Sequence, residues 1–237
     1  MLTTEILSTI ALPLALLVLI SSTARLIHLK LFERYFKLTF VDAPVWSLLY
    51  FTFWSCVVFL FFPLEIQALF AQVSLIGYLF LAVVLLVLFP TIYKLLKANV
   101  GNPEWLAKLY PEQGILSFEE AYIFAKIGDV IFQQFVAGAM ILTLVAQGVE
   151  YPQITGIFVI LFMFAHLYIF REAGLIWGMH YTAYATLGAF AIPFFIIFVP
   201  AGVVYAIVLH MLFYVLSAVF FAILPYPTKA VRRHIGH

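Results

Sequence analysis

Two adjacent glutamines stand in a stretch of sequence that is otherwise almost wholly apolar. Gln133 and Gln134 lie in GDVIFQQFVAGAMI, and Asp129 precedes Gln133 by four residues. At this spacing Asp129 and Gln133 share one face of a helix, while Gln134 lies about 100° further round. A carboxylate in an apolar helix is a functional-site candidate because its burial is costly. The amides either belong to such a site or form hydrogen bonds between helices.

Three histidines follow in three later apolar stretches. His166 lies in FMFAHLYIF, His180 in IWGMHYTAY and His210 in VVYAIVLHMLF. A single histidine on an apolar helix is commonly a packed, hydrogen-bonded residue, whereas three on consecutive helices indicate a shared site. Together with Asp129 they are ligand types that zinc or another divalent metal accepts. A metal site and hydrogen-bonded packing are therefore alternative expectations.

The apolar stretches that carry these residues are long enough to cross a membrane. The chain has 237 residues, of which 66% are hydrophobic and 10% charged, against about half and about a quarter in soluble domains. A span needs about 20 residues and must be helical, because no water is present to satisfy its backbone. The sequence predicts an all-α, polytopic transmembrane helix bundle of about seven spans. The predicted spans are Ile6–Ala24, Val45–Phe62, Val73–Ile92, Gly128–Gln147, Gln153–Phe170, Leu175–Phe198 and Gly202–Leu224.

The charged residues predict how these spans are oriented. Every lysine and arginine lies after the first, third, fifth or seventh predicted span, whereas the opposite side keeps only Glu5, Glu65 and Glu150. Basic residues collect on the cytoplasmic side of membrane proteins. We therefore expect the N-terminus outside, the C-terminus in the cytoplasm, and a location in the plasma membrane.

The chain divides into four predicted parts. These are three N-terminal spans in residues 1–100, a cytoplasmic loop and interfacial helix in 101–127, a four-helix core carrying the polar site in 128–225, and a basic cytoplasmic tail in 226–237. This layout places Gln133, His166 and His180 in the cytoplasmic third of the membrane, and His210 nearer its middle.

The segment LSFEEAYIFAK opens a helix that either lies at the membrane interface or extends the fourth span. Ser117 and Glu120 form the S-x-x-E pattern of a capping box. Glu119 and Glu120 therefore most simply serve a helix N-terminus, where carboxylates are favourable. A catalytic carboxylate pair is the alternative. The charged pair at 171–172 is most simply a solvated turn between the fifth and sixth spans.

Composition also limits the partners of the chain. The net charge of +1 argues against a large nucleic-acid-binding surface, so the lipid bilayer is the expected partner. Cys56 is the only cysteine, which excludes an internal disulfide and any metal motif built on cysteine. We expect the first apolar stretch to be a retained helix, because no basic residue precedes it and no small-residue cleavage site follows it.

The order of the polar residues resembles the CPBP family of intramembrane proteases, the CAAX-protease and bacteriocin-processing (Abi-type) proteins. The family pattern is EExxxR on one helix, FxxxH on the next, and HxxxN or a variant on a later one. The stretch FMFAH from Phe162 to His166 fits FxxxH, and AGVVYAIVLHMLF is similar to the last core helix of the family. Gln133 and Gln134 lie about 32 residues before His166, where the glutamate pair falls. The resemblance covers roughly residues 128–224.

This sequence departs from the family pattern at three places. Glutamines replace the glutamate pair, Gly138 stands in the arginine position, and Tyr214 stands in the asparagine position. The resemblance implies that a glutamate activates the attacking water with the histidines assisting, and an amide cannot act as that base. It therefore implies an inactive or non-proteolytic member of the family. The site residues that it implies are Gln133, Gln134, His166 and His210.

Three functions stay open on the sequence alone. The first is a CPBP-like protein for peptide, prenylated or lipid substrates, which takes its base from Asp129, Glu119 or Glu120 if it is active. The second is a non-enzymatic lipid- or peptide-binding protein with an immunity or scaffolding role, in which the two glutamines and Tyr214 would supply hydrogen bonds. The third is a small transporter, although we find no inverted repeat in the sequence.

Overall fold

The computed structural model describes residues 4–36, 43–71, 120–167 and 175–223, with Phe170 and a few isolated positions between 75 and 94. Throughout these residues the chain is helical and contains no strand, as the sequence predicts. The elements are α1 (Thr4–Ile27), the π-helix η1 (His28–Tyr35), α2 (Pro44–Phe61), α3 (Pro63–Ala71), α6 (Glu120–Ala146), α7 (Tyr151–His166), α9 (Leu175–Phe198) and α10 (Gly202–Ile223).

Three of the described helices are long and apolar enough to cross a membrane. These segments are Ile10–Ile27, Pro44–Phe61 and Phe124–Ala146. Shorter apolar helices cover Tyr151–Phe164, Gly188–Phe198 and Gly202–Leu212. Length and composition therefore support a helical membrane protein.

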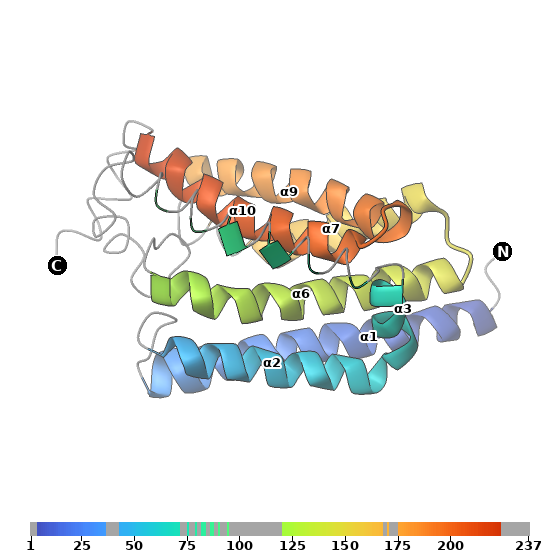
Figure 1. The fold of residues 1–237 in the computed structure, drawn as a ribbon. Coiled ribbons are helices and arrows are strands. Elements are labelled where there is room, and N and C mark those ends of the chain that lie inside the picture. Colours follow the sequence, from blue (N-terminus) through green and yellow to red (C-terminus); the bar gives the residue numbers. More distant parts are fainter. Residues whose placement is uncertain are drawn as a thin grey trace.

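The helix α6 is the centre of the bundle. It contacts each of the other α-helices that the structure describes, and Figure 1 shows α1 and α2 on one side of it and α7, α9 and α10 on the other. Of its spanning segment 61% is buried, compared with 17% for α1 and 22% for α2. The helix that carries Asp129 and the two glutamines is therefore the least lipid-exposed of the three.

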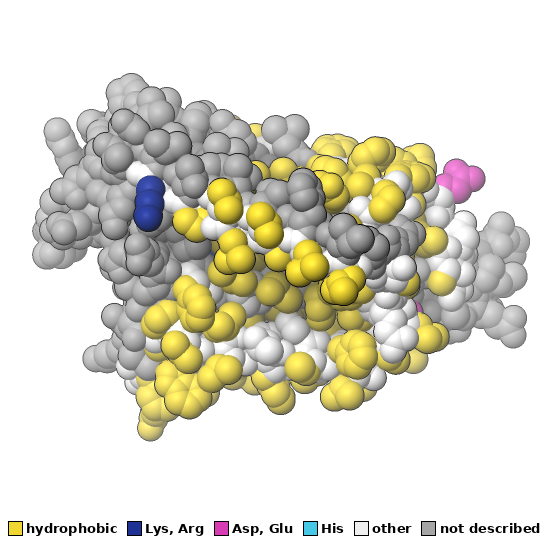
Figure 2. Space-filling model, in the orientation of Figure 1, with side chains coloured by type: hydrophobic (Ala, Val, Ile, Leu, Met, Phe, Trp, Pro, Cys, Tyr) yellow, Lys and Arg dark blue, Asp and Glu magenta, His cyan; other side chains and the backbone are white. Residues whose placement is uncertain are grey.

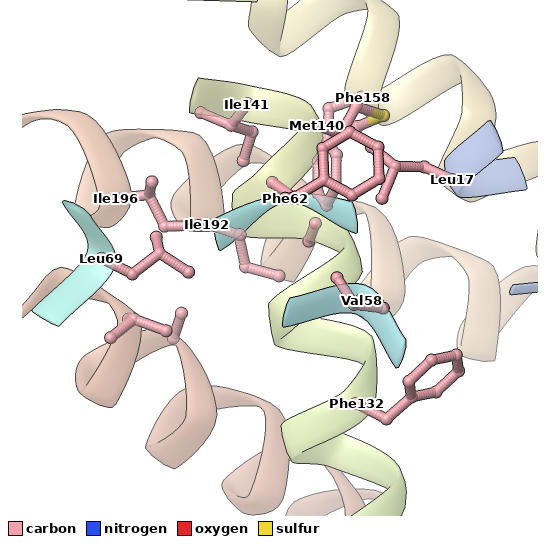
Figure 3. Close-up of a cluster of buried hydrophobic side chains, with 14 of the residues drawn as sticks. Leu17, Val58, Phe62, Leu69, Phe132, Met140, Ile141, Phe158, Ile192 and Ile196 are labelled. Atoms are coloured by element: carbon pink, nitrogen blue, oxygen red, sulfur yellow. The ribbon is translucent and has the colours of Figure 1, made fainter. Parts of the chain in front are cut away.

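The core lies along α6 and is made of aliphatic and aromatic side chains. Phe132, Ile141 and Leu144 of α6 are almost fully buried, as are Phe51 and Val58 of α2. Figure 3 shows how side chains from both halves of the bundle meet around α6. Inside a membrane such a core is stabilised by van der Waals packing between the helices, because lipid is as apolar as the side chains themselves.

Close packing of α2 on α6 depends on Gly128. A Cβ atom at Gly128 would lie 3.0 Å from Leu48 Cδ1 and 3.1 Å from the Leu48 Cα and carbonyl oxygen. Two of these three atoms belong to the backbone of α2, so they cannot yield without moving that helix. Small residues of this kind let membrane helices approach closely.

Among the side chains that Figure 2 colours by type, most are hydrophobic. A basic side chain lies toward the end where α10 finishes, and an acidic side chain lies at the opposite end. Exposed leucine, valine and phenylalanine side chains include Leu12, Leu60 and Leu64, each more than 70% exposed. An apolar surface of this extent is typical of contact with lipid.

Two boundaries differ from the prediction. The fourth span was expected to begin at Gly128, but α6 begins at Glu120, so the segment before Gly128 extends the span and does not lie along the interface. The short helix α3 was not predicted; it follows α2 directly, because Pro63 ends one helix and suits the first position of the next. The predicted span Val73–Ile92 lies largely outside the described residues, as do residues 101–119 and 224–237.

Candidate functional site: two polar groups along the central helix

Asp129 is the centre of a buried charge cluster. Its side chain is fully buried and forms ion pairs with Arg25 of α1 and Lys126 of α6. The Lys126 Nζ atom lies 2.9 Å from Asp129 Oδ2, and the Gln133 Nε2 atom donates to Asp129 Oδ1 at 2.9 Å. The predicted sharing of one helix face by Asp129 and Gln133 is therefore confirmed. Each carboxylate oxygen has a charged partner, as a buried carboxylate requires.

Arg25 links this cluster to the aromatic core. Its guanidinium lies 5.3 Å from the centroid of the Phe51 ring, within the range of a cation–π contact. Phe51 packs in turn on Phe132 of α6, with 5.8 Å between ring centroids. The sequence places Arg25 beyond the first span, but α1 continues to Ile27 and carries Arg25 into the bundle.

The C-terminal end of α1 is followed by the π-helix η1, which begins at His28. The Tyr50 hydroxyl of α2 donates to the Ala24 carbonyl, one turn before His28, at 2.6 Å. The His28 backbone interacts with the same hydroxyl. The His28 ring stacks on Phe51, with centroids 5.3 Å apart.

A second polar contact joins α6 to α10. The Gln134 Nε2 atom lies 3.0 Å from His210 Nδ1. Because an amide nitrogen only donates, His210 Nδ1 accepts, and its ring proton then lies on Nε2. Gln134 is 1% exposed, and within the part of the chain that the structure describes its Oε1 atom has no hydrogen-bond partner. Gln133 and Gln134 therefore serve different neighbours, one in the charge cluster and one on α10.

Gln134 lies at the middle of the segment Phe124–Ala146, because α6 begins earlier than predicted. Its contact with His210 puts these two residues at the same level of the bundle. The position of Gln133 in the cytoplasmic third of the membrane stays a prediction. Asp129 lies about 8 Å nearer the Glu120 end than Gln134, at 1.5 Å per residue.

One turn beyond Gln134, the helix α6 lacks a side chain. A Cβ atom at Gly138 would lie 2.5 Å from Leu69 Cδ1 and 2.8 Å from Leu69 Cδ2. Leu69 of α3 is 6% exposed and fills this space. Figure 3 shows Leu69 directed from α3 toward α6. In the predicted alignment, Gly138 is the arginine position.

The remaining predicted site residues are placed only as backbone or not at all. His166 is the last residue of α7, His180 lies in α9, Tyr214 follows His210 by one turn of α10, and Glu120 opens α6, but their side chains are not described. Glu119 and the pair at 171–172 lie outside the described residues. Among the described residues, no three histidine, cysteine or acidic side chains lie close enough to hold a metal ion, so the zinc hypothesis stays a prediction.

Comparison with known protein families, proteins and structures found no match. No family model matches the chain, and no curated protein or solved structure matches it. The fold supports a helical membrane protein, and any function must therefore be argued from the site.

Sequence reasoning missed two members of the charge cluster. Lys126 precedes Asp129 by three residues, so an earlier start for the fourth helix would have placed both on one face. Arg25 lies 104 residues before Asp129, and no local signal connects residues so distant. The aromatic partners Tyr50 and Phe51 likewise become apparent only from the packing of α2 on α1.

Proposed function

We propose that this chain is a polytopic protein of the plasma membrane with seven spans, an outside N-terminus and a cytoplasmic C-terminus. Two observations support the proposal. The start of α1 and the end of α10 lie at opposite ends of the bundle (Figure 1), as an odd number of crossings requires. Arg25 and Lys126 both lie toward the end where α1 finishes and α6 begins, which the positive-inside bias assigns to the cytoplasm.

Within this bundle, we propose a CPBP-like site that has kept an arrangement of helices but lacks its base, so that the protein is non-proteolytic. The observation that carries the proposal is the contact of 3.0 Å between Gln134 and His210. These residues come from the two stretches that the resemblance aligns with the glutamate pair and the last histidine of the family. Their contact is what a glutamate acting together with that histidine would need.

The chemistry of the side chains favours a site without proteolysis. Gln134 offers a hydrogen-bond donor and an acceptor, but its amide cannot take a proton from water near neutral pH. Asp129 is a poor substitute as the base, because both of its oxygens already bind Arg25, Lys126 or Gln133. Gln134 and Asp129 thus support hydrogen bonding and provide no carboxylate base beside His210.

The test is peptide hydrolysis by the purified chain beside Gln134→Glu, Gln133→Glu and the double variant, with metal content measured in each. We expect no hydrolysis by the native chain, and a gain with Gln134→Glu and with the double variant. Gln133→Glu is the matched control, because Gln133 binds Asp129 and not His210. Hydrolysis by the native chain would contradict the proposal, and so would a complete lack of gain in well-folded Gln134→Glu and double variants.

A non-enzymatic binding role is the second candidate, and one observation favours it. The Gln134 Oε1 atom is buried and has no hydrogen-bond partner among the described residues. Burial of such an atom is costly unless a donor bonds to it. A peptide N–H or a lipid hydroxyl would supply the missing donor. Binding of a hydroxyl-bearing lipid that weakens in Gln134→Leu would support this role, and unchanged binding would refute it.

A further inference from the structure

The polar contact between α6 and α10 has an apolar neighbour on the same helix face. Gln134 and Gly138 are four residues apart on α6, so they lie on one face and about 6 Å apart along the axis. His210 reaches Gln134, and Leu69 fills the space at Gly138. The helix α3 contacts both α6 and α10. Leu69 therefore lies one turn of α6 away from the polar contact, on a helix that also contacts α10.

The position of Leu69 relative to the contact follows from the direction of α6. This helix runs from Glu120 toward the loop that leads to α7, so Gly138 lies nearer that loop than Gln134 does. In the proposed topology this is the outer side. Ile66 is also buried, 3% exposed, and precedes Leu69 by one turn of α3. The buried edge of α3 thus lies along the outer side of the polar contact.

We propose that α3 is a built-in cap that closes the Gln134–His210 site on its outer side, with Leu69 seated against Gly138. The inference rests on the proposed function in treating this contact as the site, and on the proposed topology in naming the outer side. The absence of a side chain at Gly138 is what admits Leu69, since even a methyl group would collide with it. Gly138 and Leu69 form a matched pair, and removal of Leu69 should open a path to His210 from the outer side.

Cysteine accessibility tests the cap directly. Cys56 is the only cysteine in the chain, so Cys56→Ser gives a clean background for His210→Cys. The protein in intact cells is treated from outside with a membrane-impermeant maleimide, with and without Leu69→Ala. Leu64→Ala is the matched control, because Leu64 is on the same helix but 76% exposed.

We expect slow labelling of His210→Cys while Leu69 is present. Leu69→Ala should raise the labelling rate by about tenfold or more. A tenfold rise corresponds to ~1.4 kcal/mol in the free energy of opening the path to His210. Leu64→Ala should leave the rate unchanged. Gly138→Ala should give a smaller rise, because it displaces the flexible Leu69 side chain without removing it. Rates with Leu69→Ala and Leu64→Ala that agree would overturn the proposal, as would fast labelling with Leu69 in place.

A second measurement guards against a misfolded variant. Leu69→Val makes a smaller truncation, and acylation of His210 by diethyl pyrocarbonate, followed by mass spectrometry, needs no engineered cysteine. A faster reaction at His210 in Leu69→Val than in the native chain supports the cap, and equal rates refute it. Neither experiment measures hydrolysis, so failure of the glutamate variants to cleave peptide leaves this result unaffected.

Discussion

Asp129 is a carboxylate in the most buried of the three candidate spans, and its neighbours explain how the bundle tolerates it. Arg25 comes from α1, Lys126 from the preceding turn of α6, and Gln133 from the following turn. Intramembrane charges are retained where they pair and where they serve a function. The cluster connects α1 to α6 and fixes the direction of the Gln133 side chain, which leaves Gln134 as the amide that faces α10.

Removal of the Asp129 charge should destabilise the protein strongly. Breaking a buried ion pair costs about 3–5 kcal/mol, and we expect Asp129→Asn to cost ~3 kcal/mol, at the lower end of that range, because the Arg25 side chain is 40% exposed. Gln133→Leu is the control and should cost only ~1 kcal/mol, for one hydrogen bond. Unfolding in detergent measures both variants. Equal losses for the two would show that the ion pairs contribute little.

The contact between Arg25 and Phe51 should appear as an energetic coupling. A cation over an aromatic ring at a partly exposed site contributes about 0.5–1 kcal/mol. A double-mutant cycle with Arg25→Met and Phe51→Leu removes the cation and the ring in turn, and so isolates this term from the packing cost of each substitution. We expect a coupling of that size in the free energy of unfolding. Strict additivity of the two substitutions would contradict the contact.

At the residue scale the sequence identifies candidate site residues but does not show which residues most of them contact. Asp129, Gln134 and His210 are conspicuous because polar residues are rare in apolar helices. The pairing of Gln134 with His210 was suggested only by the resemblance, since 76 residues separate them. Arg25 looked like an ordinary flanking charge, because a boundary error of a few residues decides whether it lies in a loop or in the bundle.

At the scale of elements, α6 holds the bundle together through close contacts on several faces. Gly128 allows the backbone of α2 to approach, and Gly138 admits a side chain from α3. Helix positions were predictable because apolar runs of about 20 residues are a strong signal. The start of α6 was not predictable from the apolar pattern, since its first turns carry the charged residues Glu120 and Lys126. The helix α3 was missed because Pro63 marks a boundary without showing that another helix follows at once.

Substitution of Gly128 tests the contact between α2 and α6. Gly128→Ala should destabilise the protein by about 1–3 kcal/mol, because the added methyl group meets the backbone of Leu48. Gly156 of α7 is the matched control, since a Cβ atom there would meet nothing within 4 Å. Gly156→Ala should be neutral or stabilising by up to ~1 kcal/mol from helix propensity. Thermal unfolding measures both variants. Equal changes in stability for Gly128→Ala and Gly156→Ala would contradict close packing of α2 on α6 at Gly128.

For the whole molecule, the distribution of charge predicts the orientation in the membrane. Glu150 lies in the exposed loop between α6 and α7, and Tyr35, which is 75% exposed, ends η1 at the other end of the bundle. In a Cys56→Ser background, Glu150→Cys should react with an impermeant maleimide in intact cells. Tyr35→Cys should react only after permeabilisation. The opposite pattern would reverse the proposed topology.

We infer that α6 and α10 bring Gln134 and His210 into one site. A double-mutant cycle with Gln134→Leu and His210→Leu, followed by unfolding in detergent, measures the strength of this contact. We predict a coupling of about 0.6–1.7 kcal/mol, as measured for side-chain hydrogen bonds between membrane helices. The control cycle with Gln133→Leu and His210→Leu should be additive within ~0.3–0.5 kcal/mol. Additivity in the Gln134 cycle, or equal coupling in both cycles, would contradict the claim.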